Sequence, residues 1–159
     1  MMRAAFYKSV RPGLQGIYSR GVRLVDRGPY SHCELIFSDG LSASASYIDK
    51  GVRLKRIDYD PAHWDILDLP GFDEAAARTW CGSRVGHGYD LLGNLRFSFG
   101  GVQDDDGKWF CSEALMAALG FAEPWRFGPN GAAAALRRWC RATHETPAES
   151  GFFTSKENK

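Results

Sequence analysis

The sequence predicts an α+β fold, in which an antiparallel sheet packs against helices. Short segments rich in apolar residues and separated by turn residues occupy the first half of the chain, and segments with helical periodicity occupy the second half. With 159 residues, 44% of them hydrophobic, the chain is long enough for one domain with its own core. We expect this domain to span residues 1–142, followed by a polar tail at 143–159.

The first half of the chain contains five expected strands. Turns at 38–40 and 49–51 separate consecutive strands. After the second turn, apolar residues alternate with basic ones, which is typical of a strand with one buried face. We expect the last four strands to form an antiparallel meander. The expected strands cover residues 2–7, 33–37, 41–47, 52–57 and 64–69.

The expected helices are marked by caps and by periodic apolar residues. Asp73 is an acidic N-cap, and Gly120 is a natural C-cap for the segment that begins at Cys111. A loop rich in glycine and aspartate, residues 99–108, leads into that segment. The expected helices cover residues 15–26, 73–83, 89–97, 111–120 and 131–141.

Charge and composition exclude several classes of function. A formal net charge of +1 gives no support for nucleic-acid binding. No apolar run approaches the length of a membrane span, and the N-terminus lacks the apolar stretch of a signal peptide, so we expect a cytoplasmic protein. Without a CxxC pair, we expect no structural zinc and four reduced thiols. The cysteines are Cys33, Cys81, Cys111 and Cys140.

Cys111 is the candidate nucleophile. It opens an amphipathic segment, so it should lie in the first turn of a helix, beside unpaired N–H donors and the positive end of the helix dipole. Both features stabilise a thiolate and lower the pKa of a thiol. The alternative is a buried core thiol without chemistry, which is the usual interpretation of an isolated cysteine.

His32 is the candidate partner of the thiol. It precedes an apolar strand, and the strand period of two places Glu34 on the same face and Cys33 on the opposite one. A carboxylate beside an imidazole can fix its tautomer and stabilise imidazolium. The alternative for Glu34 is a solvated strand residue. Because Cys33 should point away from His32, we do not expect it to be the nucleophile.

The order of several short motifs resembles a known family. The motifs are Pro29-Tyr30-Ser31-His32-x-Glu34, Gly51-Val52-Arg53, Tyr89-Asp90 and Phe110-Cys111-Ser112-Glu113. Together they are similar to the circularly permuted, NlpC-like papain-fold proteins, the YiiX-like cysteine amidohydrolases, with lecithin:retinol acyltransferase as a more distant relative. In this permuted branch the histidine precedes the cysteine along the chain, as it does here.

The resemblance implies a role for each site residue. Cys111 would be the nucleophile, with its backbone N–H in the oxyanion hole, and His32 would be the general base and acid. Glu34 matches the third residue of the pattern, although Ser44 or Ser46 on the next strand could take that place. Tyr89 is a candidate for the second oxyanion donor.

These roles lead to a cysteine hydrolase that cleaves an amide, ester or thioester bond through a thioester intermediate. Such an enzyme acts on a small-molecule, lipid or peptide substrate and requires no cofactor. Two alternatives are an acyltransferase with the same site and a binding module that keeps the fold without catalysis. A metal site formed by His32, Glu34 and Cys111 is disfavoured, because these residues lack short chelating spacing.

Overall fold

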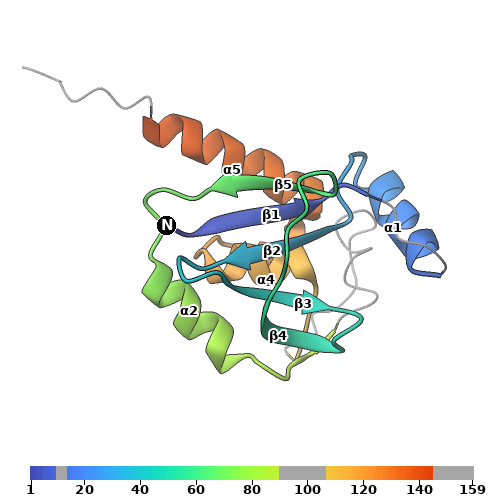
Figure 1. The fold of residues 1–159 in the computed structure, drawn as a ribbon, viewed down its shortest axis with the longest axis horizontal. Helices are drawn as coiled ribbons and strands as arrows, with labels where there is room; N and C mark the ends of the chain where they lie inside the picture. Colours follow the sequence, from blue (N-terminus) through green and yellow to red (C-terminus); the bar gives the residue numbers. More distant parts are fainter. Residues whose placement is uncertain (10–13, 90–106, 145–159) are drawn as a thin grey trace, which may run out of the picture.

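The predicted α+β class is confirmed. The computed structural model describes residues 1–9, 14–89 and 107–144, which form a seven-stranded, mostly antiparallel sheet and four α-helices (Figure 1). The strands are β1 (Arg3–Tyr7), β2 (His32–Ile36), β3 (Leu41–Ser46), β4 (Gly51–Arg56), β5 (Trp64–Asp68), β6 (Gly88–Tyr89) and β7 (Lys108–Trp109). The helices are α1 (Leu14–Val25), α2 (Glu74–Ser83), α4 (Cys111–Ala118) and α5 (Pro129–His144).

The sheet is not the simple meander that the sequence predicts. Its strand order is β5-β1-β2-β3-β4-β6-β7, so β2, β3 and β4 form a meander but β5 lies at the far edge, next to β1. Residues 57–63 cross one face of the sheet to make this connection (Figure 1). The buried run Ala4-Ala5-Phe6 explains the order, because an apolar strand gains more from two neighbours than from an edge position.

Three further expectations need correction. Tyr89 ends a short strand and does not begin a helix; the rest of that expected helix lies outside the described residues. Lys108, the last residue of the expected loop, instead begins β7, which runs parallel to β6. The last helix begins at Pro129, because proline is compatible with the first turn, and it extends to His144, beyond the expected helix end at residue 141.

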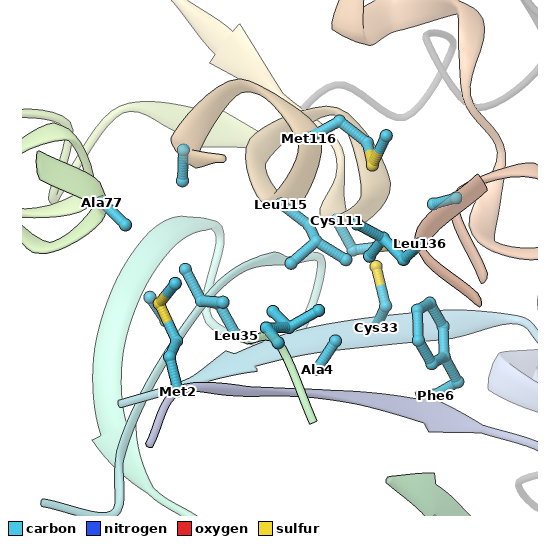
Figure 2. Packing of buried hydrophobic residues seen from close by; sticks show 14 of the residues in the cluster. Met2, Ala4, Phe6, Cys33, Leu35, Ala77, Cys111, Leu115, Met116 and Leu136 are labelled. Carbon is cyan, nitrogen blue, oxygen red and sulfur yellow. The ribbon is translucent and has the colours of Figure 1, made fainter. Parts of the chain in front are cut away.

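The main core lies between the sheet and three helices. Side chains from β1, β2 and β3 pack there against α2, α4 and α5, and Figure 2 shows part of this packing. Each large apolar side chain buried in such a core stabilises the fold by roughly 2 kcal/mol. A second, smaller cluster on the opposite face of the sheet is formed by Ala5, Ile36 and Trp64 with Tyr7 and Tyr59.

Polar contacts hold the start of β2 and the end of α4. Asn130, at the start of α5, bonds the Tyr30 carbonyl and N–H (2.9 Å each), which anchors the chain just before β2. Gly120 has a φ of 80°, and the Phe121 N–H donates to the Met116 carbonyl (3.0 Å), so α4 ends as a Schellman motif. None of the helices in the described part of the chain is long and apolar enough to cross a membrane.

Candidate active site

Cys111 occupies the first position of α4. Phe110, the N-cap residue, has no polar side chain, so Glu113 closes the helix end by accepting the Phe110 N–H at 3.3 Å. The N–H of Ala114 donates to the Phe110 carbonyl (3.0 Å). The amides of the first turn before Ala114, including that of Cys111, therefore have no acceptor within the helix. The thiol lies at the positive end of the helix dipole.

His32 and Glu34 form a hydrogen-bonded pair at the start of β2. Nε2 of His32 lies 2.8 Å from Oε1 of Glu34, and the two side chains are 17% and 1% exposed. Glu34 is thus buried, and the alternative of a solvated strand residue is wrong. Burial alone would raise the pKa of Glu34, but hydrogen bonds and positive charge from His32 and Arg53 lower it.

The imidazole also interacts with the thiol of Cys111. Burial alone would lower the pKa of His32, but the negative charges of Cys111 and Glu34 and hydrogen bonds to both raise that pKa to about 9. Since Nε2 faces Glu34, Nδ1 is the ring nitrogen that remains for the thiol. The positive charge of His32 in turn helps to lower the pKa of Cys111. The pair favours thiolate and imidazolium.

Cys33 is a second thiol next to Cys111. Both residues are almost completely buried in the main core, and Figure 2 shows the Cys33 sulfur directed from β2 toward α4. The neighbouring Cys33 thiol is the largest cause of the lowered pKa of Cys111, ahead of burial, which opposes it. Burial raises the pKa of the Cys33 thiol itself, so Cys111 is the more acidic thiol of the two. Strand alternation predicts that Cys33 points away from His32. It does not predict that Cys33 packs against α4.

A polar network continues from Glu34 onto β4. Arg53 donates from Nη1 to Oε2 of Glu34 (2.7 Å) and from Nη2 to Oε1. Its Nε donates to Oδ2 of Asp49 (2.9 Å), which also accepts from Lys55 (2.9 Å). Burial opposes ionisation of Asp49, but these two cations lower its pKa to about 2. Charges of alternating sign therefore follow one another from the site to the β3–β4 turn.

Neither Arg53 nor Asp49 was predicted as a site residue from the sequence. One signal is present: a carboxylate that is buried on a strand needs a cation, and β4 carries basic residues on every second position. Which of them faces Glu34 depends on the register, because Arg53 pairs with Ser44 of β3 in the sheet. The register is not predictable from the pattern alone.

The other candidate residues make different contacts. The Ser44 hydroxyl contacts backbone carbonyls, donating to that of Cys33 at 2.8 Å. Ser46 is buried at the end of β3, paired with Gly51. Tyr89 packs against a separate cluster of Ala45, Val52 and Ala114, with its ring 6.0 Å from that of Tyr47. Within the described residues, no group of three or more His, Cys, Asp or Glu side chains could hold a metal ion.

Comparisons with known proteins found no relative of this chain. The chain matches no family model, no curated protein and no solved structure.

Proposed function

We propose that this protein is a cysteine hydrolase with a circularly permuted papain-like arrangement. The observation that carries the proposal is the group formed by Cys111, His32 and Glu34: a thiol at a helix N-terminus, an imidazole that interacts with it, and a buried carboxylate 2.8 Å from that imidazole. The histidine strand precedes the cysteine helix in the chain, and α4 packs on β2 and β3. This order and packing support the permuted arrangement.

The chemistry proceeds in two stages. The Cys111 thiolate attacks a carbonyl carbon, a C–S bond forms, and negative charge develops on oxygen beside the amides of the first turn of α4. The bond to the leaving group then breaks as His32 gives that group its proton, and a thioester remains. Neutral His32 takes a proton from water, whose oxygen attacks the thioester and releases the acid and the Cys111 thiolate.

The first test is the reactivity of the thiol, because it needs no knowledge of the substrate. Iodoacetamide labelling of each cysteine is followed by mass spectrometry as a function of pH. We expect Cys111 to label fastest, with a midpoint below that of a free thiol, about 8.5. Cys81 and Cys140 are internal controls, because burial raises their pKa values. Labelling of Cys111 at the rate and midpoint of these two cysteines would contradict the proposal.

The second test identifies the bond. A panel of a chromogenic ester, a thioester and an aminoacyl amide is incubated with the wild type and with Cys111→Ser. We expect turnover of at least one class by the wild type and none above background by the variant. Addition of a primary amine tests for acyl transfer, since an amide product would then appear at the expense of the acid. A reactive Cys111 without any turnover would favour the binding-module alternative.

A further inference from the structure

The Arg53 side chain joins Glu34 to the rest of the polar network. Its guanidinium lies between two carboxylates, with both Nη atoms on Glu34 and Nε on Asp49. The side chain is 13% exposed, and Glu34 is 1% exposed. A planar fork that is bonded along two edges has little freedom to rotate, so it fixes the plane of the Glu34 carboxylate.

The catalytic cycle requires this second cation. While His32 is imidazolium, Glu34 has two positive partners, His32 and Arg53. When His32 passes its proton to a leaving group, one of these charges disappears. A buried carboxylate left without any cation would take up a proton itself and would stop orienting the ring. Arg53 supplies a charge that does not change during the cycle.

We propose that Arg53 is a positioning residue that keeps Glu34 ionised and correctly oriented in both protonation states of His32. The inference rests on the proposed function, since it assigns Arg53 a part in the proton transfer of that site. Asp49 is the next member, because it holds the free edge of the guanidinium.

Other groups near the network do not replace Arg53. The Tyr59 hydroxyl donates to Ser42 (2.8 Å), and burial together with the charge of Glu34 raises the pKa of Tyr59, so this phenol stays neutral. Trp64 contacts the His32 ring, with centroids 6.2 Å apart, and carries no charge. Within residues 1–9, 14–89 and 107–144, the titratable and charged groups nearest His32 are Cys33, Glu34 and Cys111. Tyr7, Asp26, Arg53 and Tyr59 lie beside these residues or interact with them.

The test measures His32 directly by NMR of protein labelled at its histidine rings. In Arg53→Gln a cation near the imidazole is lost and Glu34 keeps His32 as its principal positive partner. We therefore expect the titration midpoint of His32 to move upward, by roughly one pH unit. Because that proton is held more tightly, turnover of the best substrate of the panel should fall by up to about 10-fold, and lost orientation of the Glu34 carboxylate should lower it further.

Two variants separate positioning from a purely structural role. Arg53→Lys keeps the charge but loses the fork, so we expect the His32 midpoint to stay near that of the wild type while turnover falls. Lys55→Gln is the matched control: it removes a cation from the same strand and the same carboxylate, Asp49, but does not reach Glu34. We expect Lys55→Gln to leave both the His32 midpoint and turnover unchanged.

The outcomes distinguish this inference from the proposed function. An unchanged His32 midpoint in a folded Arg53→Gln variant, or the same shift in Lys55→Gln, would overturn the role of Arg53 even if Cys111 is a reactive nucleophile. Cys111 labelling no faster than Cys81 in the wild type would overturn the proposed function instead. If Arg53→Gln does not fold, the decision rests on Arg53→Lys: a midpoint near that of the wild type with reduced turnover supports positioning, and unchanged turnover contradicts it.

Discussion

The two faces of β2 have opposite characters, although they belong to the same five residues. On the face toward the helices, Cys33 and Leu35 pack into the main core with Cys111 of α4. On the other face, Ile36 packs in the smaller apolar cluster, but Glu34, which is buried just as completely, is bonded to His32 and Arg53. Burial opposes charge on both faces, and the two faces stabilise charge in different ways.

A negative charge on Cys111 is favoured by the Cys33 thiol on the apolar face and by the positive charge of His32. On the polar face, each charge has a partner of opposite sign, from Glu34 through Arg53 to Asp49. A change on the apolar face should therefore alter the reactivity of a thiol. A change on the polar face should leave a buried charge unpaired and affect stability as well.

The largest effect is expected at Cys111, the proposed nucleophile. Cys111→Ser should lower turnover by about 10⁴-fold or more, because a serine hydroxyl in this site is not ionised as the thiol is. The unfolding midpoint in urea should change little, because the two side chains have nearly the same shape. Cys140→Ser, at a buried cysteine outside the site, is the control and should retain full turnover. Comparable activity in both variants would remove Cys111 from the mechanism.

Glu34→Gln should remove the negative partner of both His32 and Arg53 on the polar face. Turnover should fall by up to about 10⁴-fold, because the amide cannot stabilise imidazolium. Shape alone predicts little loss of stability, but the buried guanidinium of Arg53 loses its partner, so the folded state should lose about 3 kcal/mol. Urea unfolding measures this loss.

The double variant Glu34→Gln with Arg53→Met sharpens this comparison. It removes both charges of the pair, so it should be more stable than Glu34→Gln alone, although inactive. If the double variant is less stable than either single variant, the unpaired charge is not the cause of the loss.

The dependence of stability on pH should also come from the polar face. The pKa of Glu34 is lower in the folded state than the ordinary value of 4.5. Its contribution to stability is therefore complete above pH 4.5 and is lost as pH falls through the folded value. Between about pH 7 and about pH 3 the wild type should lose more unfolding free energy than Glu34→Gln. Equal losses would show that other groups, such as Asp49, account for the whole dependence.

A smaller effect is expected from Cys33 on the apolar face. Cys33→Ala removes the thiol that contributes most to the lowered pKa of Cys111, so the pH midpoint for iodoacetamide labelling of Cys111 should rise. Cys33→Ser keeps a donor of similar size and should shift the midpoint less. Equal midpoints in wild type and Cys33→Ala would assign the lowered pKa of Cys111 to His32 and the helix end alone.

The smallest effects should come from the serines of β3. Ser44→Ala loses a buried hydrogen bond to the Cys33 carbonyl, which typically costs about 1 kcal/mol, and turnover should stay within a few-fold of the wild type. Ser46→Ala should be similar or milder. A loss of turnover in Ser44→Ala as large as that in Glu34→Gln would move the orienting role to β3.

Local signals in the sequence are sufficient for much of the fold. Alternating and apolar runs locate β1 to β5 to within about a residue or two, and the Asp73 cap and Gly120 stop mark α2 and the end of α4. These features depend on the conformational preferences of a few neighbouring residues, and these preferences do not require tertiary contacts. The strand period also predicts that His32 and Glu34 share one face of β2, and their hydrogen bond agrees with that.

The partners of these elements were decided only by the tertiary structure. The position of β5 beside β1, the Arg53 fork on Glu34 and the Cys33 contact with Cys111 all join segments distant in the chain. Strand order and register are set by total burial over the whole sheet, and a shift of one residue would turn Arg53 to the other face. Local sequence patterns therefore indicate which residues are candidates for chemistry, and packing selects which of them come into contact.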